Sequence, residues 1–309
     1  MADGNDPGAG PPTPRQQGNN APRSGGDSFD AAANELTLSI RDLPTLPTAV
    51  MEVIRVANDS YASGQDLERV VSRDMTLAAR VLKISNSAAF GMRRRIETTK
   101  HAVLILGTRR IRSIVSAMSL APMFETAHAR DLISGPQLWA HALACAMWTQ
   151  HLADRLQYIY WDQVFMAGLM HDIGIVVLFQ AAPERYTEVL RVAKERRLPL
   201  EAVEEHLLGT THARVAGHLC AKWMLTPNLT HLLARHHSAE MPDKIDAQLL
   251  RLADYMASHT VATEFTWSEP RPIPGELLAV AGLTQDDIRE VIEQGQEDVI
   301  RQVKIFLDS

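Results

Sequence analysis

Among the histidine and aspartate residues beyond residue 140, seven form a candidate set of ligands for divalent metal ions. Two pairs are adjacent in the sequence, His171 with Asp172 and His236 with His237. Imidazole and carboxylate ligands suit Fe, Mn, Zn and similar ions. We therefore predict that one or two ions are held by members of the following set: His141, His171, Asp172, His212, His236, His237 and Asp254.

The pair His171 and Asp172 places a demand on the local backbone. Neighbouring side chains on a straight helix point about 100° apart, so both reach one ion only where the helix ends or bends. Gly174 follows the pair and predicts such a break. The other gaps are too long for spacing to test, so a hydrogen-bonded polar core without metal stays the alternative.

A basic stretch between residues 93 and 112 forms a second candidate site. It contains six arginines and Lys100, and it is opposed only by Glu97. Because arginine binds phosphates in a bidentate fashion, the stretch predicts an anionic ligand, a nucleotide or an acidic partner protein. The alternative is a solvated charged face, and nucleic acid is not expected, because few aromatic residues lie nearby to stack on bases. The six arginines are Arg93, Arg94, Arg95, Arg109, Arg110 and Arg112.

Composition describes an ordinary folded protein that does not coat nucleic acid through bulk charge. The 309 residues carry a net charge of −6, and 46% of them are hydrophobic. Two cysteines exclude a disulfide framework and indicate a reducing compartment. With no apolar run of about 18 residues and no secretory signal, we expect a cytoplasmic protein that does not span a membrane.

Hydrophobic periodicity beyond Leu36 is helical, with no alternating segment long enough for a strand. Ser63 with Asp66, and Thr284 with Asp287, resemble capping boxes, and Gly107 predicts a helix stop. The apolar stretch 161–180 reads as a buried helix. Asp162 is expected to cap its first part. Helices are predicted at 137–156, 162–171, 184–197, 199–208, 211–224, 227–237, 244–261 and from 284 onward.

We predict an all-α fold, a helical bundle in two parts. The Gly- and Pro-rich segment 1–35 has too little apolar surface to fold and is predicted to be a disordered tail. Pro122, Gly135 and Pro136 suggest a boundary near 125–136. The expected divisions are an N-terminal helical subdomain over 36–130, a second subdomain over 131–265, and a proline-containing loop with a C-terminal helix over 266–309.

The order of an isolated His, a His-Asp pair and a distant Asp resembles the HD-domain metal-dependent phosphohydrolases. The wider set is similar to HD-GYP phosphodiesterases, which cleave cyclic dinucleotides. This resemblance implies that His141, His171, Asp172 and Asp254 hold one ion. It also implies that His212, His236 and His237 help to hold a second ion, with Asp172 bridging. Paired metals about 3.5–4 Å apart can activate a hydroxide for attack on phosphorus.

The N-terminal half resembles a more specific relative, the HDOD (HD-related output) domains of bacterial signalling. The resemblance covers roughly 36–262 and implies a C-terminal HD-like metal-binding core. Its motifs are Leu43-Pro44-Thr45-Leu46-Pro47, the segment from Asp74 to Ala88, Ala102 to Gly107, and Gly209-Thr210-Thr211-His212 followed by Trp223, Pro227 and His236-His237.

The resemblance implies a regulatory module that binds a signalling protein or a nucleotide second messenger without catalysis. Two departures from HD-GYP enzymes agree with this expectation. Ile175 replaces their lysine, and Ser238 to Pro242 replaces their Gly-Tyr-Pro element. The alternatives are a two-metal phosphohydrolase or cyclic-dinucleotide phosphodiesterase, in which Asp172 would be catalytic, and an interaction scaffold without metal.

Overall fold

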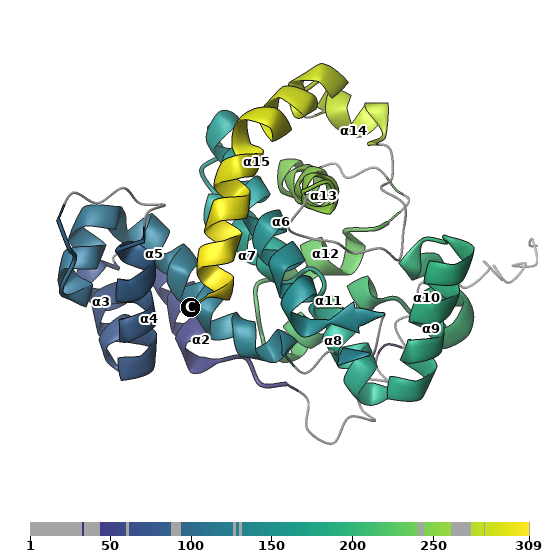
Figure 1. The fold of residues 1–309 in the computed structure, drawn as a ribbon, viewed down its shortest axis with the longest axis horizontal. Helices are drawn as coiled ribbons and strands as arrows, with labels where there is room; N and C mark the ends of the chain where they lie inside the picture. Colours follow the sequence, from purple (N-terminus) through teal and green to yellow (C-terminus); the bar gives the residue numbers. More distant parts are fainter. Residues whose placement is uncertain are drawn as a thin grey trace, which may run out of the picture.

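Figure 1 shows the fold of the chain in a computed structural model. The structure describes residues 33, 44–59, 62–87, 94–125, 128–129, 132–238, 240, 244–260, 273–280 and 282–308. The predicted disordered tail, except Ala33, lies outside the described residues, as does Arg93.

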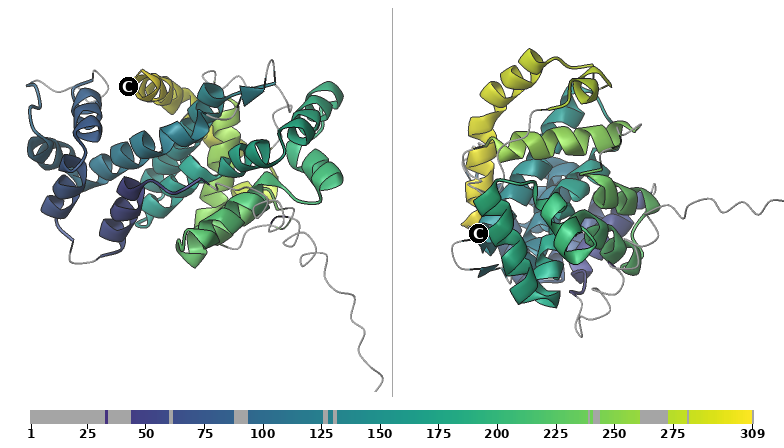
Figure 2. Two further views of the ribbon diagram at one scale, coloured as in Figure 1. Left: turned by 90° about the horizontal axis from the view of Figure 1, so that it is seen from below. Right: turned by 90° about the vertical axis from the view of Figure 1, so that its right-hand side faces the viewer.

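Four helices form a lobe at one end of the molecule (Figures 1 and 2). Their apolar faces meet around Leu67, Val81, Ile84 and Ile114, which are fully or almost fully buried. The bounds are α2 (Thr48–Asn58), α3 (Gly64–Ser72), α4 (Met75–Ser85) and α5 (Thr99–Phe124).

The rest of the chain builds a larger body around α6, which packs against α7, α13 and α15. Helix α6 buries apolar residues along nearly its whole length and therefore lies inside this body. The bounds are β1 (His128–Ala129), β2 (Ile133–Ser134), α6 (Gly135–Arg155), α7 (Trp161–Met170), α8 (Ile173–Ala181), α9 (Pro183–Arg196), α10 (Leu200–Leu208), α11 (His212–Lys222), α12 (Pro227–Arg235), α13 (Ile245–Ser258), α14 (Gly275–Val280) and α15 (Gln285–Leu307).

The predicted all-α class is confirmed. Within the described residues the one departure is the antiparallel pair β1 and β2, two residues each, which is too short to show in a periodicity. The capping boxes that open α3 and α15 are present. The predicted helix stop at Gly107 is present as a kink, with φ 77° and ψ 161°, which joins two helical segments of α5.

The predicted break at the pair His171 and Asp172 is confirmed, because α7 ends at Met170 and α8 begins at Ile173. Two other local predictions in the 161–180 stretch are wrong. Gly174 is not the site of the break, because it lies inside α8. Asp162 does not cap α7, because the helix begins one residue earlier, at Trp161. The Asp162 carboxylate instead pairs with Arg112 at 3.4 Å.

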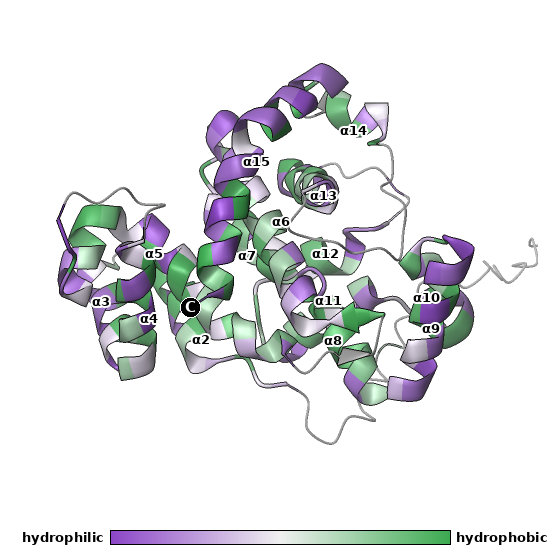
Figure 3. Cartoon of the chain, viewed as in Figure 1, coloured by the Kyte–Doolittle hydropathy of each residue, from purple (hydrophilic) through white to green (hydrophobic). Residues whose placement is uncertain are grey.

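Helix α15 carries hydrophilic and hydrophobic residues along its length (Figure 3) and buries the latter against α6. The Asp287 carboxylate lies 3.5 Å from the Arg155 guanidinium of α6. At the other end of the helix, Lys83 of α4 donates a 2.6 Å hydrogen bond to the Asp308 carbonyl oxygen. Helix α15 therefore packs against the larger body through α6 and contacts the α2–α5 lobe through Lys83.

The stretch Trp161–Ala181, which comprises α7 and α8, is long and apolar enough to cross a membrane by length and composition alone. However, 83% of its most apolar window is buried inside the protein. The polar pair His171 and Asp172 lies in its middle. Its packing is that of core helices.

Candidate metal centre

The seven candidate ligands come from separate helices that converge in the larger body. His141 lies on α6, and His171 and Asp172 form the turn between α7 and α8. The remaining four are His212, the first residue of α11; His236 and His237, directly after α12; and Asp254 of α13.

Glycine allows the helices that carry these ligands to approach closely. A Cβ atom on Gly174 of α8 would lie 1.9 Å from the carbonyl oxygen of His212. A Cβ atom on Gly168 of α7 would lie 2.6 Å from the Cα atom of Ala146 on α6. The role of Gly174 is therefore to bring Asp172 and His212 together, not to break a helix.

The first cluster consists of His141, His171 and Asp172, all buried. The Nε2 atoms of His141 and His171 are 3.2 Å apart. Asp172 Oδ2 lies 3.1 Å from His171 Nε2 and 3.6 Å from His141 Nε2. Asp254 Oδ1 completes the group at 3.1 Å from His141 Nε2.

The second cluster consists of Asp172, His212, His236 and His237. The other carboxylate oxygen, Asp172 Oδ1, lies 3.4 Å from His212 Nε2 and 3.8 Å from His236 Nε2. His237 Nδ1 lies 4.0 Å from Asp254 Oδ2. The two oxygens of Asp172 thus face different clusters, as a bridging ligand requires.

Hydrogen bonds behind the imidazole rings leave ligand nitrogens directed at the centre. The Nδ1 atoms of His171 and His236 lie 2.9 Å and 2.8 Å from the carbonyl oxygens of Gly168 and Leu233. A carbonyl only accepts, so Nδ1 carries the proton and Nε2 can offer its lone pair. The Nε2 atoms of His212 and His236 are buried and make no hydrogen bond.

The geometry fits metal ions. Nitrogen and oxygen ligands lie about 2.0–2.2 Å from a transition metal, so two ligands of one ion are at most about 4.4 Å apart. In the first cluster the ligand atoms lie 3.1–3.6 Å apart, and in the second Asp172 Oδ1 lies 3.4 Å from His212 Nε2 and 3.8 Å from His236 Nε2. Buried imidazole nitrogens that make no hydrogen bond are costly unless something binds them. The buried cluster could hold a metal, and the donor set suits Fe, Mn or Zn.

Sequence reasoning missed the residues that support the ligands. Buried Glu204 of α10 accepts hydrogen bonds from the backbone nitrogen and Nδ1 of His212. Arg251 of α13 donates to the carbonyl oxygens of Arg235 and Ser238 and so fixes the turn with His236 and His237. No motif marks these residues, and only the fold brings them to the site.

The pKa values of three imidazole rings of the cluster are shifted in different directions. Burial opposes the charged form of His212, but the carboxylates of Glu204 and Asp172 outweigh it and raise its pKa to about 10. Burial, together with His171 and His212, lowers the pKa of His236 to about 3. Burial and the neighbouring His236 also hold the pKa of His237 well below its usual range. Without metal, His212 is therefore charged and the other two rings are neutral.

These charges predict that metal binding weakens as the pH falls. A ligating imidazole must be neutral, and with a pKa near 10 His212 holds its proton at pH 7 when no metal is present. Binding must release that proton, so affinity should fall about tenfold per pH unit for each proton released between pH 8 and pH 6. Calorimetric titration with Mn²⁺ in buffers of different ionisation enthalpy measures the release, and an affinity independent of pH would contradict it.

The structure divides the basic stretch rather than gathering it into one surface. Arg109 pairs with Asp154 at 2.6 Å and lies 4.2 Å from the centre of the Trp161 ring. Arg112 pairs with Asp162 and lies over the same ring. These two arginines hold α5 against α6 and α7. Arg110 lines a separate pocket of about 340 Å³ under α15.

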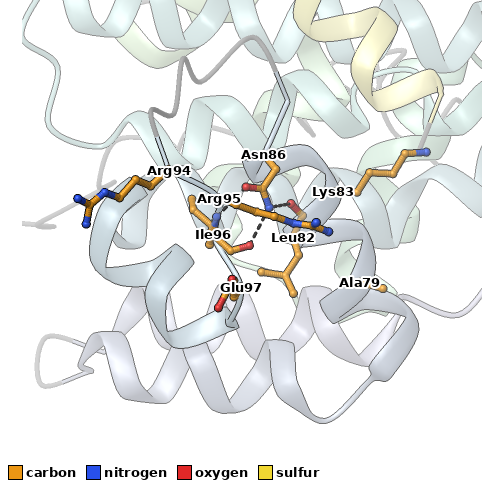
Figure 4. Close-up of a pocket in the computed structure, with 8 residues that line it drawn as sticks. All are labelled: Ala79, Leu82, Lys83, Asn86, Arg94, Arg95, Ile96 and Glu97. Atoms are coloured by element: carbon orange, nitrogen blue, oxygen red, sulfur yellow. Dashed lines mark hydrogen bonds between the residues drawn. The ribbon is translucent and has the colours of Figure 1, made fainter.

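Arg94 and Arg95 line a different pocket, in the α2–α5 lobe, with a volume of about 790 Å³ (Figure 4). Asn86 shapes its floor by hydrogen bonds to the backbone of Leu82 and Ile96. Arg94 and Arg95 extend to opposite sides in Figure 4. Because Arg109 and Arg112 are paired with carboxylates, the prediction of an anionic ligand applies best to Arg94 and Arg95, each of which would contact a different side of such a ligand.

The fold is all-helical within the described residues, and it encloses a buried cluster of histidine and aspartate side chains. A sequence model of the HDOD domain matches residues 43–239, more than half of the chain. The chain belongs to the HDOD domain family. The predicted resemblance is thereby confirmed. An uncharacterised protein of Treponema pallidum (strain Nichols) is 25% identical over 201 residues, and the chain spans 38% of the length of that relative.

Solved structures share the fold. An HDOD domain protein of unknown function from Geobacter sulfurreducens has a TM-score of 0.76 and 21% identity, over 91% of this chain and 97% of that one. A proposed signal transduction protein of Marinobacter aquaeolei VT8 has a TM-score of 0.73 and 20% identity, over 92% of this chain and 66% of that one. A proposed phosphohydrolase of Shewanella amazonensis SB2B has a TM-score of 0.69 and 22% identity, over 89% of this chain and 98% of that one.

Proposed function

We propose that this chain is a metal-containing regulatory domain that acts by binding a protein or nucleotide partner in the cytoplasm, without turnover. The observation that supports metal is the meeting of two ligand clusters at Asp172, whose two oxygens face different imidazoles. His141, His171, Asp172 and Asp254 would hold one ion. His212, His236 and His237 would hold the second ion together with Asp172.

The ions would fix the relative positions of the helices that supply these ligands. His141 belongs to α6 and Asp254 to α13, while His212 and His236 belong to the pair α11 and α12. A shared centre would make their relative positions sensitive to metal binding. Such a rigid body suits a domain that presents a surface to a partner.

Two positions, Ile175 and Arg251, count against catalysis. Ile175 stands where the HD-GYP enzymes have a lysine, and it is buried in the core. Arg251, close to His236 and His237 in the fold, directs its guanidinium at backbone carbonyl oxygens. We propose that neither position supplies a cation for a substrate phosphate.

For the partner, we propose an anionic group that binds at Arg94 and Arg95. Both arginines are exposed, and Lys83 adds a third positive charge to the same pocket, against Glu97 alone. Arginine recognises phosphate and carboxylate through paired hydrogen bonds. A nucleotide second messenger and an acidic segment of a signalling protein both offer this chemistry.

A metal-dependent phosphohydrolase is the second candidate function, and the complete set of seven ligand residues favours it. Bound divalent ions would supply Lewis acidity and an activated water to a phosphoester. Asp172 would be the shared ligand of both ions. Asp254 and His237 would face substrate, since their side chains, 19% and 20% exposed, are the most accessible of the cluster.

Turnover and binding can be separated in one experiment. We expect the Mn²⁺- or Fe²⁺-loaded chain to form no product from cyclic dinucleotides and nucleoside phosphates. Any binding should be weakened by the double change Arg94→Ala and Arg95→Ala. Product analysis by chromatography and binding by calorimetry provide the two readouts. Product that accumulates with the wild type and is absent with Asp172→Ala would instead establish the phosphohydrolase.

A further inference from the structure

We propose that Glu204 is a positioning residue for the second ion, and that it couples helices α9 and α10 to the metal centre. The proposal rests on the proposed function, because it requires that the cluster of Asp172, His212, His236 and His237 binds an ion. It concerns a carboxylate that is not itself among the candidate ligands.

Glu204 is a fully buried carboxylate with three hydrogen-bond donors. Its Oε2 accepts from the backbone nitrogen of His212 at 2.8 Å and from His212 Nδ1 at 2.7 Å. Its Oε1 accepts from the Tyr186 hydroxyl at 2.6 Å. Because a buried charge is costly unless it is satisfied, this arrangement has to be specific. It holds the Nδ1 edge of the His212 ring so that Nε2 faces Asp172.

His212 differs from two other histidines of the centre in the group that its Nδ1 atom contacts. The Nδ1 atoms of His171 and His236 lie against backbone carbonyl oxygens, whereas that of His212 lies against a carboxylate. A carboxylate behind a ligating histidine fixes its tautomer and strengthens its donation to the metal, and loss of such a partner typically weakens metal binding about 10–100-fold. Loss of the Glu204 carboxylate should therefore weaken metal binding by the second cluster.

The same hydrogen bonds link the centre to a peripheral part of the fold. Helices α9 and α10 pack against each other and stand at the end of the molecule opposite the α2–α5 lobe (Figures 1 and 2). Tyr186 belongs to α9, Glu204 to α10 and His212 to α11. Binding of an ion by His212 therefore depends on the relative positions of all three helices. Motion of the α9–α10 pair would weaken the binding of that ion before the binding of the other.

The test compares Glu204→Gln with Glu205→Gln in the full chain. Glutamine keeps the shape of the side chain but removes its charge, while Glu205 is exposed and pairs with Arg214. In Mn²⁺ titrations we expect Glu204→Gln to weaken one of two binding steps 10–100-fold and to leave the other unchanged. Hydrogen exchange of α9 and α10 should slow on adding Mn²⁺ to the wild type and to Glu205→Gln, but not to Glu204→Gln.

The outcomes separate this proposal from the proposed function. A wild type that binds no Mn²⁺ would refute the metal-containing domain itself. Two unchanged binding steps in Glu204→Gln, or equal weakening of both steps, would overturn the role of Glu204 alone. Should Glu204→Gln not fold, Tyr186→Phe retains the carboxylate and removes one donor. It should weaken the same step by a smaller factor, and no change in that step would overturn the proposal.

Discussion

Replacing Asp172 with alanine should remove both ions at once, the largest effect expected of any single substitution in this chain. Its two oxygens face different imidazoles, Oδ2 towards His171 at 3.1 Å and Oδ1 towards His212 at 3.4 Å. Loss of an outer partner costs about 10–100-fold in metal affinity, so loss of the shared ligand should cost more.

The same variant should stop responding to chelators. An ion present at 100 times its dissociation constant stabilises the folded state by about 2.7 kcal/mol. Removing metal from the wild type should therefore lower its melting temperature by several degrees, whereas Asp172→Ala should melt at the same temperature with or without chelator. Asp154→Ala, which removes an exposed carboxylate paired with Arg109, is the control, and chelator should lower its melting temperature as much as it lowers that of the wild type. A chelator response retained in Asp172→Ala would refute the bridging role.

Replacing Gly174 with alanine should both destabilise the fold and displace ligands of the centre. The added methyl group would lie 1.9 Å from the His212 carbonyl oxygen, so α8 and α11 would have to move apart. Overpacking of this kind costs about 1–3 kcal/mol. Because the contact is with rigid backbone rather than a flexible side chain, we expect a cost near 3 kcal/mol, with reduced metal content.

Chemical denaturation and metal analysis measure the two effects of Gly174→Ala. Gly275→Ala is the matched control, because its Cβ atom would meet no atom within 4 Å. It should change the free energy of unfolding by less than about 1 kcal/mol. If Gly174→Ala were as stable as Gly275→Ala and kept its metal, the close approach of α8 and α11 would not be what positions His212.

The sequence reveals the ligand types because they depend on residue identity and on residues that are close in the sequence. His171 and Asp172 are neighbours, as are His236 and His237, and the helix caps at Ser63 and Thr284 depend on residues three positions away. Periodicity likewise indicates helices without strands. These features need no knowledge of how the helices pack, which explains why the fold class and the candidate ligands could be predicted.

The supporting residues could not be predicted in the same way, because packing decides them. Glu204 resembles its exposed neighbour Glu205 in the sequence, and only the approach of α10 to α11 buries it against His212. Arg109 and Arg112 look like part of a basic surface until α6 and α7 bring Asp154 and Asp162 to them. Gly174 resembles a helix breaker, although its role is contact between helices.

Elemental mass spectrometry of the wild-type chain, purified without chelators, tests the central claim most directly. If two clusters share Asp172, the protein should carry between one and two equivalents of Fe, Mn or Zn. Dialysis against a chelator followed by one of these ions should restore the same content. Metal far below one equivalent before and after such reloading would contradict the account and leave the seven residues as a polar core without metal.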